Sequence, residues 1–259
     1  MTEEEQKLSE QIQKQKAERT KKALNIRKVW EMIQEHRKTI IRLSDYDLSD
    51  NVEFQKHLNL IVEIGNNYLL REQRKFIIDD SNIKLIHFLL YYFNDCELAE
   101  HIFERKCSLH KNLLIVGPPG TGKTLLMQIF SDYLKMTNNH HQFWNSSVTQ
   151  MSNYYKNHNH IDLYTYHEDA KRGYMPSPFS ICLNDVGLDT ERQKNFGTDI
   201  KSVIDEYLYA RYEIYQQWGI RHHITSNFNV DDFKNRFDTR ITDRFKTFNV
   251  IPLEGVSRR

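Results

Sequence analysis

The spacing of hydrophobic positions changes near residue 110 and divides the chain into two kinds of structure. Residues 3–43 lack Gly and Pro and are rich in Glu, Gln, Lys and Arg, which predicts a helix whose apolar side thickens toward its end. A turn over 44–50 and a second helical stretch over 52–74 follow. The Asp-Asp-Ser run at 79–81 predicts the start of another helix, because such side chains accept hydrogen bonds from the first free N–H groups.

From residue 112 onward, short apolar runs alternate with amphipathic segments. Fully apolar strands that alternate with helices are typical of a mainly parallel sheet covered on both faces. The predicted fold class is therefore α/β, with a mainly parallel five-stranded sheet flanked by helices and preceded by an α-helical N-terminal region. The predicted strands are 112–116, 141–145, 179–183, 221–227 and 247–253, and the predicted helices between them include 124–136 and 200–218.

Composition is that of a folded chain in a reducing compartment. The 259 residues are 39% hydrophobic and include 14 Phe and 14 Tyr. The three cysteines are odd in number and widely spaced, which argues against a disulfide framework and a cysteine zinc site. We expect a cytoplasmic protein with no membrane partner, since no apolar run is long enough to span a bilayer and the first residues are charged.

Positive charge is concentrated near the beginning of the chain. The formal net charge is only +1, yet residues 7–42 hold eleven Lys and Arg against four Glu. Three interpretations remain open for this basic helix: a solvated charged helix, an arm that contacts DNA, or a helix that docks on a partner protein.

A phosphate-binding motif follows the first strand. The sequence GPPGTGKT at 117–124 fits GxxxxGK[ST] in full and lies between a predicted strand and a predicted helix. In such a loop, backbone N–H groups and the helix N-terminus surround phosphate oxygens. We expect Lys123 to reach the β- and γ-phosphates of ATP and Thr124 to coordinate Mg²⁺. The predicted nucleotide-binding residues are Gly117, Pro118, Pro119, Gly120, Thr121, Gly122, Lys123, Thr124 and Leu125.

The Pro-Pro-Gly-Thr form of this loop resembles that of the AAA+ ATPases. The later segments ITSN, RITDRF and GVSRR make the region from about residue 80 to 259 similar to the DnaC-type helicase loaders and the IstB-type transposition helper ATPases. This resemblance implies an AAA+ domain over 79–259 without a C-terminal helical lid. Residues 1–78 resemble no family and are expected to form a helical region that binds a partner or DNA.

The resemblance also implies roles for single residues. Asn227 matches the sensor that orients the attacking water, and Arg244 matches an arginine finger acting on the nucleotide of a neighbouring subunit. Arg240 lies four residues earlier and is expected to assist that finger. Arg259 matches the arginine that replaces the lid's sensor. A finger acting in trans implies self-assembly into a ring or a helical filament.

The stretch FSICLNDVG, residues 179–187, resembles the second nucleotide-binding element of this family, with one acid replaced. Two registers are possible. If Asp185 were the magnesium acid, Val186 would stand at the position of the catalytic acid. In the family that this stretch resembles, the order is acid, acid, apolar residue, Gly. Aligned at Gly187, this order puts Asn184 at the magnesium position and Asp185 at the water-activating position. The expected metal site is then Thr124, Asn184 and Asp185, with slow hydrolysis, and Asn184→Asp is expected to speed turnover.

Tyrosines and cations alternate between the second and third predicted strands. Aromatic side chains that stack bases, beside cations that meet phosphates, suit single-stranded DNA. The alternative is an insertion that packs on its own domain. The histidine pairs at 140–141, 158/160 and 222–223 are interpreted as polar surface or strand residues rather than metal ligands. The nucleic-acid candidates are Tyr154, Tyr155, Lys156, Lys171 and Arg172 in this segment, and Arg192 and Lys194 just past the third predicted strand.

Together with the motifs, the resemblance implies an ATP- and Mg²⁺-dependent AAA+ ATPase that assembles on single- or double-stranded DNA and loads or licenses a partner, with a replicative helicase as the first candidate. The proposed catalytic set is Lys123, Asp185, Asn227 and Arg244. One alternative is a transposition helper that presents DNA to a transposase. The other is an ATP-gated DNA-binding scaffold with little hydrolysis.

Overall fold

The structure is a computed structural model, and it falls into two units, 1–43 and 44–259. In the first unit only residues 10, 11, 13–15, 28 and 31 are described, and all of them are helical, in line with the predicted helix. None of the helices in the described ranges is long and apolar enough to cross a membrane. In the second unit the structure describes residues 46–104, 106–167, 178–187, 200–228, 231, 232, 235, 237 and 239–258.

The second unit is built on a five-stranded parallel sheet, which confirms the predicted fold class. The strand order is β2-β3-β4-β1-β5, and every neighbouring pair is parallel. The first strand has the predicted bounds, and β2 begins three residues later than predicted. The strands are β1 (Asn112–Val116), β2 (Trp144–Ser147), β3 (Ile181–Val186), β4 (His222–Ser226) and β5 (Phe248–Pro252).

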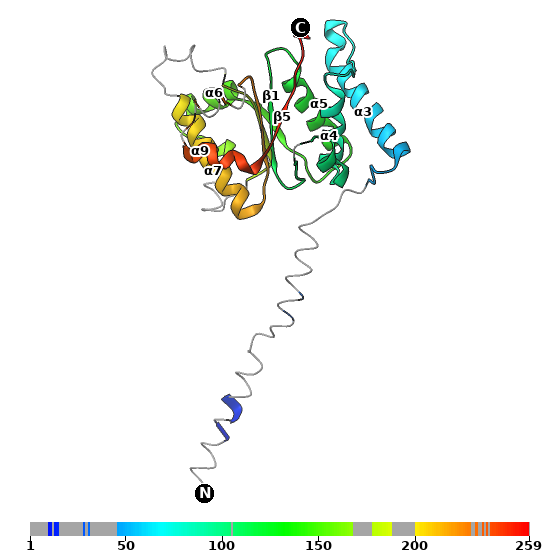
Figure 1. Cartoon of the computed structure of the whole chain (residues 1–259). Coiled ribbons are helices and arrows are strands. Elements are labelled where there is room, and N and C mark those ends of the chain that lie inside the picture. The colour runs from blue at the N-terminus through cyan, green and yellow to red at the C-terminus, as the bar shows by residue number, and fades with distance from the viewer. Residues whose placement is uncertain are drawn as a thin grey trace, which may run out of the picture. The chain divides into compact units, whose positions relative to one another are not determined.

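Helices cover both faces of the sheet, with α3, α4 and α5 on one side and α6, α7 and α9 on the other (Figure 1). Alternate side chains of β1 face the two layers: Leu113 and Ile115 belong to the first core cluster, and Leu114 and Val116 to the second. This is why the strand reads as a continuous apolar run. The helices are α3 (Asn51–Leu69), α4 (Ile83–Phe93), α5 (Lys123–Met136), α6 (Val148–His158), α7 (Ile200–Trp218) and α9 (Thr239–Arg244), and short 3₁₀ turns lie at Leu70–Glu72, Glu97–His101, Asp162–Tyr164 and Phe245–Thr247.

Helix α3 belongs to the same compact unit as the sheet, because it packs along α5. Asp50 caps its N-terminus by accepting hydrogen bonds from Val52 N and Glu53 N. The helix ends at Leu69, earlier than the predicted residue 74, and a 3₁₀ turn and an extended segment follow. The division into a partner- or DNA-binding region over 1–78 and an ATPase domain over 79–259 stays a prediction. After β5, residues 253–258 form no helix.

Two adjacent histidines of β4 are buried in the core. His222 and His223 are 1% and 2% exposed, and burial lowers the pKa of each well below its usual value. The cations Arg211, beside His222, and Arg221, beside His223, lower these pKa values further. Both rings are therefore neutral in the folded protein at neutral pH.

These histidines predict a loss of stability in mild acid. The unfolded chain takes up their protons near pH 6.5, whereas the folded chain does not, so stability is full above that pH and falls below it. We expect each buried histidine to contribute a slope of about 1.4 kcal/mol per pH unit below pH 6. Urea unfolding between pH 5 and 8 should show this slope, and His222→Phe should remove about one histidine's share of it. His158→Gln, at an exposed site, should leave it unchanged.

Candidate functional site

The phosphate loop joins the carboxyl end of β1 to the N-terminus of α5. Its base is fixed by two backbone hydrogen bonds, Gly117 N to Ser226 O at 3.2 Å and Leu253 N to Val116 O at 2.7 Å. Gly117 has φ +157°, and a Cβ on it would lie 2.1 Å from Leu253 O. Gly122 has φ +98° and directly precedes α5, so a residue with a side chain would be strained there. The first turn of α5, with its free N–H groups, directly follows the loop.

Lys123 lies at the centre of this loop. Its side chain is buried, and its Nζ donates to Gly117 O at 2.7 Å, Pro118 O at 2.8 Å and Asn227 Oδ1 at 2.8 Å. Asn227 directly follows β4, so the predicted sensor residue and the phosphate-loop lysine are in contact. A lysine whose three donors meet neutral acceptors can exchange them for phosphate oxygens.

Thr124 and Asp185 also meet in the structure. The Thr124 hydroxyl donates to Asp185 Oδ1 at 3.2 Å. Asp185 has φ +64°. Leu183 pairs with Ile224 and Val186 with Ser226, so two residues of β3 lie between these pairs against one residue of β4. This bulge turns the Asp185 carboxylate toward the phosphate loop.

Asn184 points in another direction, which differs from the expected metal position. Its side chain is 2% exposed; Nδ2 donates to Ser146 O at 2.9 Å and to Asn145 Oδ1, and Oδ1 accepts from the Thr225 hydroxyl at 3.1 Å. The residue thus links β2, β3 and β4 inside the sheet. The contact with Thr124 is made by Asp185. This favours the register that the sequence analysis rejected, in which Asp185 is the magnesium acid. Val186 then occupies the next position and is fully buried.

A cavity of about 820 Å³ opens in front of the loop, within the range of small-molecule sites. The predicted residues from Pro119 to Leu125 all line it, whereas Gly117 and Pro118 lie at the base of the loop and present their carbonyl groups to Lys123. Four cationic side chains line the cavity against two acidic ones, which suits a polyanionic ligand. They are Arg74, Lys75, Lys123 and Arg258, with Glu72 and Asp185.

Residues 68–77 form a wall of this cavity that the sequence analysis missed. Tyr68, Leu69, Phe76 and Ile77 supply apolar surface to the cavity, against which a flat nucleobase can lie. Burial, and then a hydrogen bond to Asp132, raise the pKa of Tyr68 to about 12, so its hydroxyl stays protonated. No sequence signal marks this wall, because the segment reads as the continuation of a helix.

The C-terminal segment, residues 253–258, lies against the loop. Arg258 N donates to Gly120 O at 2.9 Å, and a Cβ on Gly120 would lie 2.3 Å from Ser257 Oγ. The Arg258 guanidinium donates to the Asp79 carboxylate at 2.6 and 2.8 Å and to the Ser81 hydroxyl. Arg258 is therefore the C-terminal arginine seen at the cavity; the predicted Arg259 lies outside the described residues.

The two candidate arginines of α9 differ in their surroundings. The guanidinium of Arg244 lies 4.0 Å from the ring centroid of Tyr209 and 4.7 Å from that of Tyr212, both on α7. Arg240 is exposed. An Arg244 that acted on a neighbouring subunit would have to leave both rings, at the expense of two cation–π contacts. The role of Arg244 as a finger remains a prediction.

The candidates for nucleic-acid binding are only partly described. Tyr154 and Tyr155 are half-buried on α6 and pack against the second core cluster, and Tyr154 stacks on His158 with centroids 4.0 Å apart. Lys156 is exposed on the same helix. Helix α6 was missed in the sequence analysis, although Ser147 and Gln150 form the capping box that begins it. Lys171, Arg172, Arg192 and Lys194 lie outside the described residues.

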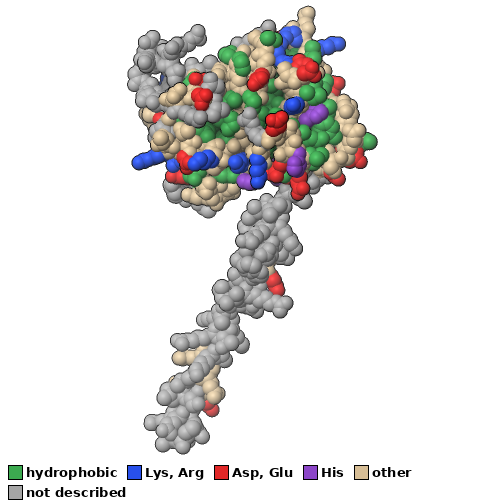
Figure 2. Space-filling view, viewed as in Figure 1, with side chains coloured by type: hydrophobic (Ala, Val, Ile, Leu, Met, Phe, Trp, Pro, Cys, Tyr) green, Lys and Arg blue, Asp and Glu red, His purple; other side chains and the backbone are tan. Residues whose placement is uncertain are grey.

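The side of the unit seen in Figure 2 carries a short row of Lys and Arg side chains with Asp and Glu beside it. On this side, positive and negative charges are interspersed. The view therefore adds no DNA-binding patch to those candidates.

Neither a protein-family model nor a curated protein matches the sequence. Among solved structures, AMPPCP-bound DnaA from Aquifex aeolicus has a TM-score of 0.46 and 16% identity over 69% of this chain. A candidate primosome component from Streptococcus pyogenes serotype M3 has a TM-score of 0.44 and 15% identity, and the match covers 71% of this chain and 85% of that one. Domain III of Thermotoga maritima DnaA has a TM-score of 0.45 and 17% identity, and the match covers 69% of this chain and 65% of that one. This chain spans about half, 48%, of the Aquifex DnaA. At these scores and identities the likenesses say nothing about the chemistry of the site.

Proposed function

We propose that this chain binds ATP with Mg²⁺, hydrolyses it slowly, and uses the nucleotide state to assemble on DNA and to load or license a partner machine. The observation that carries the nucleotide part is the cavity lined by the whole tip of the phosphate loop, with Lys123 and the Thr124–Asp185 pair at its inner end. The replication part rests on the resemblance of residues 80–259 to the helicase loaders, and a replicative helicase is the first candidate for the partner.

In this proposal each group at the inner end of the cavity has one task. The N–H groups of the loop and the N-terminus of α5 hold the phosphates, and Lys123 exchanges its carbonyl partners for β- and γ-phosphate oxygens. Thr124 would ligate Mg²⁺, and the ion supplies charge neutralisation on the transferred phosphoryl group. Asn227, in contact with Lys123, would hold the attacking water through its side-chain amide.

Asp185 has two tasks in this scheme. The first is to hold a water of the magnesium shell, which its hydrogen bond with Thr124 supports. Among the described residues that line the cavity, the only other carboxylate is Glu72, which pairs with Arg74. We therefore assign the orientation of the attacking water to Asp185 as well, with Asn227, and a single carboxylate with two tasks explains why hydrolysis should be slow.

The buried Asn184 and Val186 also favour the second candidate function, a scaffold that binds DNA when ATP is bound and hydrolyses almost none of it. The two candidates differ in turnover and agree on nucleotide binding. A partner test separates the loader from a transposition helper: co-purification with a helicase hexamer supports the first, and with a transposase the second.

The central test is ATP-dependent assembly on single-stranded DNA. We expect the full chain to form larger species with DNA and ATP, measured by sedimentation, and to release phosphate slowly. Lys123→Ala should lower ATP affinity at least about 100-fold and abolish assembly, because it removes the cation that meets the phosphates. Lys135→Ala, at an exposed lysine in the last turn of the same helix, should leave both unchanged. Tight ATP binding by Lys123→Ala would contradict the proposed site.

A further inference from the structure

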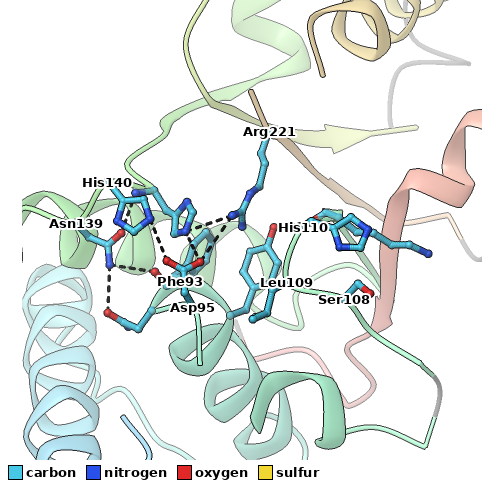
Figure 3. Close-up of polar contacts among 12 residues, drawn as sticks. Phe93, Asp95, Ser108, Leu109, His110, Asn139, His140 and Arg221 are labelled. Carbon is cyan, nitrogen blue, oxygen red and sulfur yellow. Dashed lines mark hydrogen bonds and ion pairs between the residues drawn. The ribbon is translucent and has the colours of Figure 1, made fainter. Parts of the chain in front are cut away.

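A carboxylate and two imidazoles meet at the edge of the sheet opposite the nucleotide cavity. Asp95 follows the C-terminus of α4, and His140 and His141 precede β2. Because the strands are parallel, their amino ends lie together at one edge, while the phosphate loop lies at the carboxyl edge. In Figure 3 the side chains of His140 and Arg221 converge on Asp95. This cluster takes no part in the proposed nucleotide site.

The ligand atoms are close enough to share one ion. His140 Nε2 lies 2.9 Å from Asp95 Oδ2, and His141 Nε2 lies 2.7 Å from Asp95 Oδ1. One ligand atom from each of the three residues can be chosen so that all lie within 4.8 Å of one another. The three side chains keep only 13–22% of their surface exposed, so they are partly shielded from water and still reachable by an ion.

The backbone around the cluster is fixed by buried amides. Asn139 Nδ2 donates to Phe93 O at 3.0 Å and to Asn94 Oδ1 at 3.1 Å, and Asn139 Oδ1 accepts from His141 N at 2.8 Å. The loop before β2 is thus tied to the end of α4 independently of the charged side chains. Donors held in advance lose little entropy when they bind a ligand.

Hydrogen bonds alone do not satisfy all members of the cluster. His141 Nε2 lies between the Asp95 carboxylate at 2.7 Å and Arg221 Nη2 at 3.2 Å. With a proton it can donate to Asp95 but cannot accept from Arg221; without one it can accept from Arg221 but meets the carboxylate as a second acceptor. A divalent cation in place of that proton would be met by the carboxylate and the imidazole together.

We propose that Asp95, His140 and His141 bind a zinc-type divalent ion through one carboxylate oxygen and two Nε2 atoms, with water in the remaining position. Two imidazoles and a carboxylate are a common donor set for Zn²⁺. At bond lengths of about 2.0–2.1 Å, tetrahedral ligand atoms lie about 3.4 Å apart, a spacing between the 2.7 Å from His141 Nε2 to Asp95 Oδ1 and the 4.8 Å within which all three ligand atoms lie. The bound ion would clip the loop before β2 to the end of α4.

The test is Zn²⁺ titration of the chelator-treated full chain by calorimetry without nucleotide. We expect one ion per chain and a melting temperature that rises with Zn²⁺. Asp95→Asn keeps the shape of the side chain and tolerates the positive φ of 53° at this position. It and His141→Gln should each weaken binding at least about 100-fold, more than the loss of an outer-shell partner. The double variant His158→Gln/His160→Gln removes an exposed histidine pair beside Asp162 and should bind like the wild type.

Arg221→Gln provides a change in the opposite direction. Removing a cation this close to the site should tighten Zn²⁺ binding about tenfold. Wild-type affinity in Asp95→Asn or His141→Gln, or weaker binding in Arg221→Gln, would overturn the proposal, and so would the absence of Zn²⁺ binding by the wild type. If a variant melts early without metal, His140→Gln, at the most exposed of the three ligands, serves in its place.

Discussion

Asp185→Asn is expected to lower ATP turnover by at least about 100-fold while ATP affinity changes by less than about fivefold. The carboxylate is in contact with Thr124, and among the described residues that line the cavity it is the only acid in contact with the phosphate loop, so its loss removes the group that acts on water. The phosphate-binding groups are untouched, since Lys123 keeps all three of its acceptors. Phosphate release in the presence of single-stranded DNA measures the first effect, and equilibrium binding of a fluorescent ATP analogue measures the second.

Glu72→Gln is the matched control for this experiment. It removes the other carboxylate that lines the cavity, and it should leave turnover within a few-fold of the wild type. Equal losses in the two variants would show that the effect is a general change in cavity charge. If the wild type itself releases no phosphate, the scaffold function is supported. The measurement is then the Mg²⁺ dependence of ATP binding. This dependence should weaken in Asp185→Asn and stay unchanged in Glu72→Gln.

Asn184→Asp is expected to destabilise the protein by about 2–4 kcal/mol and to leave turnover no faster. A carboxylate cannot donate to Ser146 O or to Asn145 Oδ1, and it would place a charge in the sheet interior among these acceptors. The sequence analysis predicted the opposite effect on turnover, namely that Asn184→Asp speeds it. Urea unfolding and phosphate release on the same preparation distinguish the two expectations.

The pH dependence of this variant adds a second measurement. The penalty should shrink in acid, where the carboxyl group is protonated and regains a donor. Asn157→Asp, at an exposed position of α6, should change the free energy of unfolding by less than about 0.5 kcal/mol. A stable and faster Asn184→Asp variant would show that Asn184 faces the metal after all.

The elements of the sheet could be read from the sequence because their signals are local. The apolar run of β1 and the span of α7 have the predicted bounds, and the phosphate motif lies between β1 and α5 as its spacing requires. Helix α6 was missed although its capping box is visible in the sequence, because its tyrosines were interpreted as part of one long insertion between two strands. Local signals thus predicted most of the fold.

The direction of Asn184 could not be predicted, because it depends on a backbone bulge. Gly187 fixes how the sequence motif is aligned. The positive φ of Asp185 and the slipped pairing of β3 with β4 instead decide which side chain faces the loop. The sequence analysis interpreted His140 and His141 as polar residues without a nearby carboxylate, and their contact with Asp95 was missed for a similar reason. The carboxylate and the histidine pair are about 45 residues apart in the sequence and meet through the packing of α4 against the loop before β2.

The position of the C-terminal segment offers a way to watch the phosphate loop at work. Val256 is 85% exposed, while its neighbours Ser257 and Arg258 contact Gly120. A small environment-sensitive dye on a cysteine at residue 256 would sit beside the loop without occupying the cavity. Its emission would report ligand arrival in real time, which steady-state turnover cannot do for a slow enzyme. The same contact advises against bulky purification tags at this end of the chain.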